Sequence, residues 1–463
     1  MRSIAAIFQL TLRSLLRSRF LLCVTVLALS VVILLPLTIE DDGTVSGRVQ
    51  VLVRYTLGAV TFLLSVGTLG TGPGLVAGEL ESRRLQQVLV KPVRFGQVWL
   101  GKWLALVTVN ALILGGAVLL AHGLMRWTLR ESRLTAGQIE ELHSKVNVTR
   151  VALAPEDVLL SESEITANID GMIRSGTLHS DVPESAARMT AAQRIRFERN
   201  VVPPGGTKRW SFPAVRPAPA DRPFLLRVQF LSSANEETRE MEGEWTVGEP
   251  GRDPAFRSRV RLRAFLPQEL VIPTMNFPAA VPLEVTFRNV EAAAPATVLF
   301  HVDRGVRLLV PAGSYGMNLF RAYGLILFKL ALLAAVGITM GSLFYTPVAV
   351  FTGFFVLVLF GFSGYIGWVA ETGVFYVPHD HGAPEIAVSG KIVQALDLAL
   401  KSAYRGVDRM LAPLRDLEPM ERVAGGERIL WRDVGRGLGI MVGVGCSLMA
   451  ALAIGVFRRR EMG

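Results

Sequence analysis

Six apolar blocks, each long enough to cross a bilayer as a helix, are the feature that most constrains how this chain folds. A membrane-spanning helix needs roughly 20 residues. The first block is longer than the apolar core of a secretory signal and lacks a clear small-x-small cleavage site, so we expect it to remain as an anchor. The sequence therefore predicts a polytopic α-helical membrane protein with six transmembrane helices, over about 20–39, 51–76, 103–125, 319–343, 346–370 and 434–457.

The net charge of +10 belongs mainly to the membrane-embedded part of the chain. The long insert 126–317 holds 24 basic and 23 acidic side chains, so it is close to neutral. A nucleic-acid-binding domain would carry a basic patch on a soluble part. We therefore expect no nucleic acid partner, and we expect the basic excess to serve the membrane topology.

Charge also orients the six spans. Lys and Arg are enriched in cytoplasmic loops, and the two tails and the loop 79–102 are the basic connections. Both termini are therefore predicted to be cytoplasmic, in a multi-pass protein of a bacterial inner (cytoplasmic) membrane. The short turn 344–346 then also lies inside, and the outside segments are 40–50, 126–318 and 371–433.

The spans divide the chain into segments with different expected structures. Residues 1–19 predict an amphipathic helix in the cytoplasmic interface, or else a plain extension of the first span. Spans one to three occupy 20–125, spans four and five occupy 319–370, and the last span with its cytoplasmic tail occupies 434–463. The outside segment 371–433 contains an amphipathic helix, which would pack either on the inserted domain or on the outer membrane surface.

The insert 126–318 is predicted to be a mainly-β, sandwich-like extracytoplasmic domain that begins with short helices. Apolar and polar residues alternate over 258–266 and 283–290, as in strands with one solvated face. Several such strands, spaced by turn signals, are typical of a β-sandwich. Trp210 and Trp245 are expected in its core, and the domain as a whole is expected to recruit substrate or an envelope partner.

The loop 79–102 carries the most specific pattern in the chain. It combines charged side chains with an apolar helical stripe of Leu85, Val88 and Leu89. Pro92 ends the helix, because its ring removes a hydrogen-bond donor and disfavours helical geometry in the residue before it. Taken alone, such a segment could be a plain interfacial helix with cytoplasmic Lys and Arg anchors.

The complete pattern resembles the cytoplasmic loop of type-2 ABC transporter permeases, the membrane subunits of ATP-driven exporters. The order of helices, loop and outside insert is also similar to that family, although the insert 126–317 is not part of the common core. Arg83 and Arg84 depart from the family, which usually has Gly-Thr there. The residues that match are Glu79, Glu81, Leu85, Leu89, Pro92, Val93, Arg94, Gly101 and Lys102.

The resemblance implies a coupling helix at about 82–91 that docks into a groove on a separate ABC ATPase subunit. The apolar side would enter the groove and the charges would set the register. It also implies that ATP and magnesium bind to that partner, and that this chain forms a homodimer or pairs with a related permease in membrane lipid. The coupling residues implied are Glu79, Glu81, Arg83, Arg84, Leu85, Val88, Leu89, Pro92, Arg94 and Lys102.

No motif in the sequence predicts catalysis or a cofactor bound by this chain. The glycine cluster 67–75 lacks the Gly-Lys-Ser/Thr ending of a phosphate-binding loop, so we expect tight helix packing there or a kink at Pro73. His379 and His381 flank Asp380, and we interpret them as a solvated loop in preference to a metal site. We therefore expect no catalytic residues, no metal ligands and no enzyme activity in this chain alone.

Lys329 falls about 10 residues inside the fourth predicted span. A charge at that depth is costly and often lines a pathway or an interface. The alternative is that the span starts later, so that Lys329 reaches the outer headgroups. For the whole chain, the alternative to an exporter permease is a membrane-anchored extracytoplasmic binding or scaffolding protein without transport, and a membrane enzyme is the least supported.

Overall fold

The structure is a computed structural model of the 463-residue chain. The chain divides into two compact units. The helical unit comprises Met1–Ile139, Gly316–Gly425 and Ile429–Gly463, and the β-rich unit comprises Glu140–Tyr315 and Gly426–Arg428. The structure describes residues 2–38, 45–82, 93–130, 135–146, 148–156, 160–178, 184–215, 222–233, 240–277, 280–291, 295–302, 305–366, 402, 404–409, 411–412 and 414–461.

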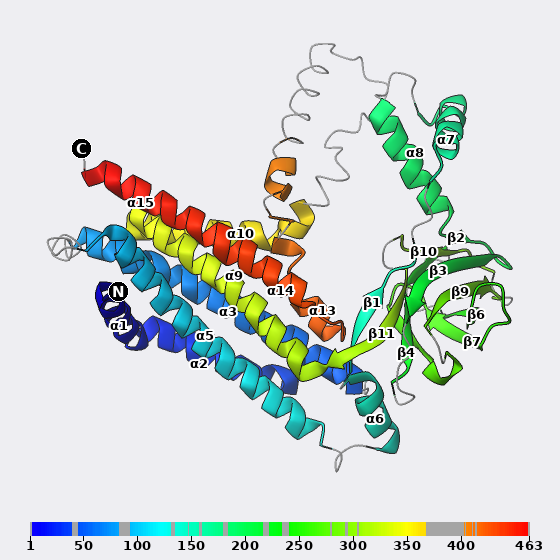
Figure 1. Cartoon of the computed structure of the whole chain (residues 1–463), viewed down its shortest axis with the longest axis horizontal. Helices are drawn as coiled ribbons and strands as arrows, with labels where there is room; N and C mark the ends of the chain where they lie inside the picture. Colours follow the sequence, from blue (N-terminus) through cyan, green and yellow to red (C-terminus); the bar gives the residue numbers. More distant parts are fainter. Residues whose placement is uncertain are drawn as a thin grey trace. The chain divides into compact units, whose positions relative to one another are not determined.

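Five helices in the described part of the chain are long and apolar enough to cross a membrane (Figure 1). Many of their apolar side chains face outward, such as Leu119 and Val444, and lipid is the environment that accommodates such surfaces. The chain is therefore a membrane-spanning protein. The five are α2 (Arg19–Thr38), α3 (Val45–Glu81), α5 (Phe95–Thr128), α9 (Tyr315–Leu343) and the continuous run of α14 (Trp431–Gly437), η4 (Leu438–Cys446) and α15 (Ser447–Glu461).

The sixth predicted span corresponds to the shorter apolar helix α10 (Thr346–Gly361). It has 16 residues, whereas a crossing needs roughly 20. A further helical turn follows at 363–366, and 367–370 lie outside the described residues. The prediction of six spans is thus confirmed for five helices and stays a prediction for α10.

The N-terminal helix α1 (Arg2–Leu16) is separate from α2, with a break at Arg17 and Ser18. It packs on α5, where a Cβ built on Gly101 would lie 2.9 Å from Ile7 Cγ2. A plain extension of the first span is therefore wrong. The position of α1 in the membrane interface stays a prediction.

Helices α3 and α9 cross in close contact at a set of glycines. A Cβ on Gly72 would lie 3.4 Å from Gly337 Cα, and a Cβ on Gly341 would lie 2.2 Å from the Pro73 carbonyl oxygen. Pro73 lies inside α3, which continues from Val45 to Glu81. The tight packing predicted for the glycine cluster 67–75 is therefore confirmed.

The described part of the segment before the last helix packs within the helical unit. Leu417 is buried with Leu332 of α9 and Met441 of η4, and α13 (Met420–Ala424) follows it. The sequence left two positions open for the amphipathic helix in 371–433, the inserted domain or the membrane surface. The described residues contact the transmembrane helices themselves, and 367–401 lie outside the description.

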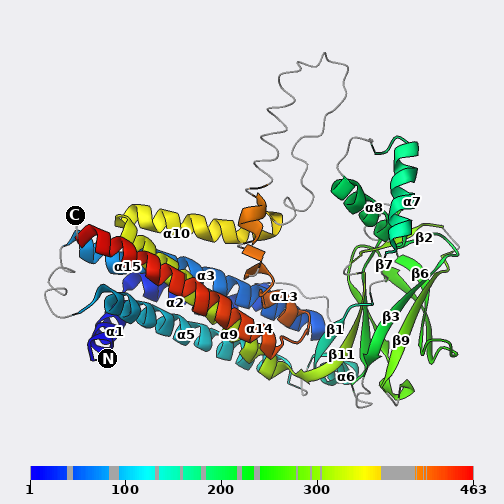
Figure 2. The ribbon, with the colours of Figure 1, turned by 45° about the horizontal axis from the view of Figure 1, so that its top comes forward.

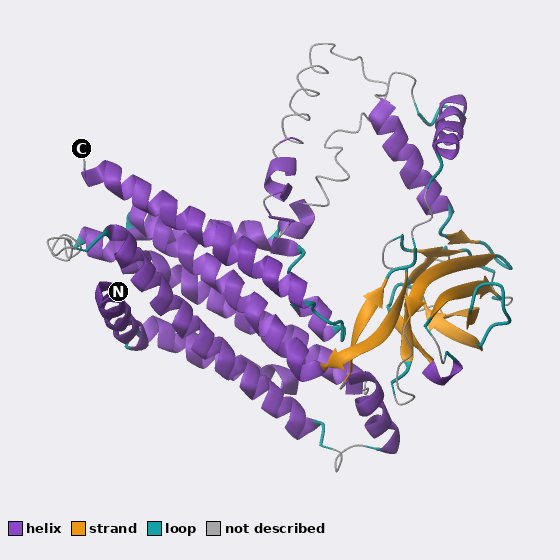
Figure 3. Ribbon diagram, viewed as in Figure 1, coloured by secondary structure: helices purple, strands orange, loops and turns teal. Residues whose placement is uncertain are grey.

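The β-rich unit holds three antiparallel sheets and a helical hairpin (Figures 2 and 3). The hairpin consists of α7 (Glu162–Arg174) and α8 (Glu184–Glu198), and α6 (Ala136–Glu141) with η2 (Leu142–Val146) leads into the first strand. The sheets run β1-β11-β4-β8, β2-β10-β5 and β3-β9-β6-β7. Their strands are β1 (Val148–Leu153), β2 (Val201–Val202), β3 (Thr207–Val215), β4 (Phe224–Val228), β5 (Phe230–Ser232), β6 (Glu240–Gly248), β7 (Phe256–Arg263), β8 (Gln268–Ile272), β9 (Val281–Asn289), β10 (Val298–Phe300) and β11 (Val306–Ser314).

All three sheets contribute to one apolar core. Alternate residues of β5, β6 and β9 are buried, which is the period of two expected for strands with one buried face. Trp245 is fully buried beside Trp210, Phe287 and Phe300. The prediction that both tryptophans belong to the core is confirmed.

Candidate functional site

The predicted coupling residues divide into a described and an undescribed group. Glu79 and Glu81 end α3, while Arg94 and Lys102 lie at the start of α5. These four residues are the anchors of the loop on its two flanking helices. The other six, Arg83, Arg84, Leu85, Val88, Leu89 and Pro92, lie outside the described residues, so the coupling helix itself stays a prediction.

Lys102 joins the two anchor helices. Its side chain is 3% exposed and its Nζ donates a hydrogen bond to the Leu75 carbonyl oxygen of α3. The same ammonium group pairs with the Glu79 carboxylate. A buried charge is tolerated where it is paired and hydrogen-bonded, and both conditions hold here. The end of α3 and the start of α5 therefore form one fixed pair on either side of the loop.

Glu81 connects this pair of helices to α10. Its Oε1 accepts a hydrogen bond of 2.8 Å from Thr346 N and one of 3.0 Å from Thr346 Oγ1. Thr346 is the first residue of α10, where backbone N–H groups lack partners in the helix and a carboxylate is favourable. The turn between α9 and α10 is thus attached to the last residue of α3.

Arg94 stands at the N-terminal boundary of α5. Its backbone N–H donates to Gln97 Oε1 at 3.2 Å, an arrangement that satisfies a donor at the helix start. The start of α5 is therefore fixed at Arg94. Together the four anchor residues connect the loop ends to α3, α5 and α10.

Lys329 pairs with an acid from another part of the helical unit. Its Nζ lies 2.9 Å from Glu418 Oε2, and both groups are half-buried. The two residues line a pocket with Phe360, Leu414 and Arg415 among others. α9 begins at Tyr315, but the start of a helix does not fix the membrane boundary. Both interpretations of Lys329, a pathway or interface residue and a residue that reaches the outer headgroups, therefore stay predictions.

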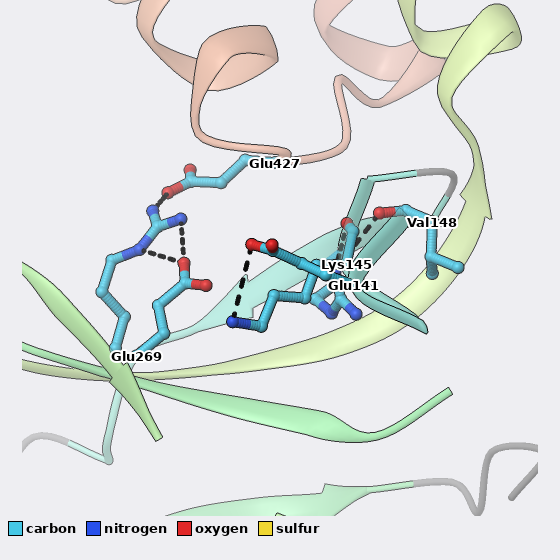
Figure 4. Close-up of polar contacts among 7 residues, drawn as sticks. Glu141, Lys145, Val148, Glu269 and Glu427 are labelled. Carbon is cyan, nitrogen blue, oxygen red and sulfur yellow. Dashed lines mark hydrogen bonds and ion pairs between the residues drawn. The ribbon is translucent and has the colours of Figure 1, made fainter. Parts of the chain in front are cut away.

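The β-rich unit contains a charged cluster that the sequence analysis missed (Figure 4). Arg227 donates to Glu269 at 2.9 Å and to Glu427 at 2.7 Å. Arg150 lies nearby at 3% exposure and donates through Nη1 to the carbonyl oxygens of Lys145 and Val148. Burial lowers the pKa of Arg150 from its ordinary value to about 10, while the charge of Glu269 acts in the opposite direction.

The same cluster attaches residues 426–428 to the sheet. Arg150 N donates to Gly426 O at 2.9 Å, and Arg428 N donates to Arg150 O at 2.7 Å. These bonds make a parallel bridge between β1 and a segment that follows it by more than 270 residues in the chain. We interpret this cluster as structural, because its cations and carboxylates neutralise one another and none of its residues is a nucleophile.

The described residues contain no group of three His, Cys, Asp or Glu side chains that could hold a metal ion. His379 and His381, the one pair that the sequence suggested, lie outside the description. A scan of the sequence against protein-family models, a search of curated proteins and a search of solved structures each returned no match. The site is therefore interpreted from its own residues.

Proposed function

We propose that this chain is the transmembrane permease subunit of an ABC transporter, an exporter driven by a separate ATPase. The observation that carries the proposal is that the helices at the two ends of the loop, α3 and α5, are joined to each other and that α3 is also joined to α10. Glu79, Glu81 and Lys102 make the attachments, and all three match the family pattern, at both ends of the loop. A loop that only rested on the membrane surface would need no such connections.

The mechanism follows from these attachments. A nucleotide-driven movement of the ATPase displaces the coupling helix at 82–91, because its apolar stripe sits in the groove of the partner. The displacement reaches α3 through its last turn and α5 through Lys102. It reaches α10 through the Glu81–Thr346 hydrogen bonds. Three helices then move together, as a conformational change of the whole pathway requires.

The remaining parts of the proposal concern location and partners. The loop and both termini lie in the cytoplasm, the β-rich unit lies outside the inner membrane, and α10 completes the six spans. Two copies of this chain, or one copy with a related permease, form the pathway in the lipid. ATP and magnesium bind to the partner subunit, and Lys329 faces the pathway or the interface.

Copurification with an ABC ATPase tests the proposal. The double substitution Leu85→Asp and Leu89→Asp should abolish it, because two carboxylates would enter the apolar groove. Leu266→Asp serves as the matched control, since Leu266 is 53% exposed in the β-rich unit and far along the chain from the loop. Unchanged copurification with residues 83–92 fully scrambled would favour a scaffolding protein without transport.

A further inference from the structure

The edge strand β7 of the β-rich unit carries four arginines on one face. Arg257, Arg259, Arg261 and Arg263 alternate with inward-facing residues, and each side chain is between 59% and 68% exposed. Residues two apart on a strand are about 7 Å apart. The four guanidinium groups, called here the arginine row, therefore span on the order of 20 Å in a line.

Two of the three acids that pair with the arginine row are recessed, and the third, Glu240 at the end of the strand, is 49% exposed. Glu240, Glu242 and Glu244 of the neighbouring strand β6 pair with the row across the strands. Glu242 and Glu244 are only 24% and 26% exposed, so the arginines cover them. A guanidinium has five N–H donors, and these cross-strand ion pairs engage only part of them. Along Arg257, Arg259 and Arg261 the outermost layer of this face is therefore cationic and rich in further donors.

The rest of the same sheet face continues this chemistry. Arg209 of β3 is 72% exposed and pairs with Glu284 of β9, which is 29% exposed. Arg288 of the inner strand β9 is exposed as well. Thr286 and Thr246 stand between Arg209 and Arg257 in the strand register, so hydroxyl groups lie between the cations. Among the described residues of these four strands, no large apolar side chain is exposed.

Protection of a sheet edge explains only part of this pattern. Charged side chains on an edge strand prevent pairing with other chains, and the arginine row alone would achieve that. Arg288, however, lies on an inner strand where no edge needs protection. The insert as a whole is nearly neutral, so its net charge does not explain why arginines are concentrated on this one face. A bound anionic ligand would explain it.

We propose that this face binds a linear acidic polysaccharide. Arginine binds carboxylates through paired hydrogen bonds, and a polymer with an acid on each repeating unit would present them in a line along the arginine row. The threonine hydroxyls would hydrogen-bond the sugar hydroxyls. A membrane surface fits less well, because the face offers no apolar side chain to insert into lipid. The inference concerns the β-rich unit alone and goes beyond the proposed transport function.

The test uses the full chain in nanodiscs of zwitterionic lipid and fluorescent polygalacturonate as the probe. Replacing the four residues of the arginine row by glutamine should weaken binding at least tenfold. The matched control replaces four exposed arginines elsewhere in the same unit and removes the same charge, so it should change binding less than twofold. The control variant is Arg174→Gln, Arg194→Gln, Arg196→Gln and Arg252→Gln.

A second variant separates loss of binding from loss of folding. Replacing the arginine row by lysine keeps the ion pairs with β6, so it should bind between the wild type and the glutamine variant. Binding should also weaken with added salt, because the contacts are exposed charges. The proposal is overturned by the absence of saturable binding, by an equal effect of the control variant, or by equal or tighter binding of polyphosphate or of phosphatidylglycerol vesicles.

Discussion

Replacing Gly341 with alanine is expected to force α3 and α9 apart. A Cβ on Gly341 would lie 2.2 Å from the Pro73 carbonyl oxygen, whereas a carbon atom in contact with a carbonyl oxygen lies about 3.3 Å away. The obstacle is backbone, so no side-chain rotation relieves it, and the helices must separate by roughly 1 Å. Such overpacking costs about 1–3 kcal/mol, which offsets the ~1 kcal/mol that alanine gains over glycine within a helix.

Thermal unfolding of the purified full chain in detergent measures this effect. We expect Gly341→Ala to unfold a few degrees below the wild type, since each kcal/mol corresponds to about 2–4 °C in large domains. Gly123→Ala in α5 is the matched control, because no atom lies within 4 Å of a Cβ there, and it should leave the midpoint unchanged or raise it. The reasoning is refuted if both variants unfold at the same temperature.

Three further predictions follow from single contacts. Arg227→Met removes the guanidinium group that bonds both Glu269 and Glu427, so the free energy of unfolding of the β-rich unit should fall by about 2 kcal/mol, the size expected for lost hydrogen bonds between charged groups. Tryptophan fluorescence in denaturant measures this free energy, and the exposed Arg209→Met should change it by less than ~0.5 kcal/mol. Hydrogen bonds from the Ser161 backbone N–H and then from the Arg199 side chain lower the pKa of Glu164 from 4.5. The Glu164 carboxylate therefore stabilises the first turn of α7 fully above pH 4.5, and this stabilisation is lost as the pH falls through the lowered pKa. Hydrogen exchange of the α7 amides should accelerate in that pH range, and equal acceleration in a Glu164→Gln variant would contradict this. Lys329→Leu should lower the melting temperature more than the double variant Lys329→Leu with Glu418→Leu, because only the single variant leaves the Glu418 carboxylate in the pocket without the ammonium group that it pairs with.

The apolar blocks predicted the membrane helices but not their ends. The second block was read as 51–76, whereas α3 extends from Val45 to Glu81. Backbone hydrogen bonding continues a helix past the point where hydropathy falls, so composition underestimates its length. The glycine cluster was interpreted correctly, because a stretch of small residues has few other uses within an apolar helix.

Long-range partners were the part of the site that the sequence could not supply. The resemblance to the permease loop pointed to Glu81 and Lys102 as coupling residues, but their contacts with Thr346 and Leu75 depend on how the helices pack. The Arg227–Glu427 pair joins residues 200 positions apart, and no local pattern links them. Hydrophobic periodicity predicts which face of a helix or strand is buried, but it does not predict which element packs against that face.

Short and irregular elements of the insert were also missed. Gly205 lies in a Pro- and Gly-rich turn and has a φ of +74°. The strands on either side of it, β2 and β3, were not predicted, because the run of Pro and Gly dominates the local composition. Helix α7 was missed as well, although Ser161 and Glu164 form a capping box at its start, a signal that the sequence does contain.

Photo-crosslinking from position 89 tests the central claim most directly. A photoreactive residue in place of Leu89, activated in native membranes that contain MgATP, should form an adduct with a protein that carries a Walker A motif. Identification of the adduct by mass spectrometry is the readout. Adducts with lipid alone, or with proteins that have no nucleotide-binding motif, would contradict the proposal that this loop couples an ATPase to the transmembrane helices.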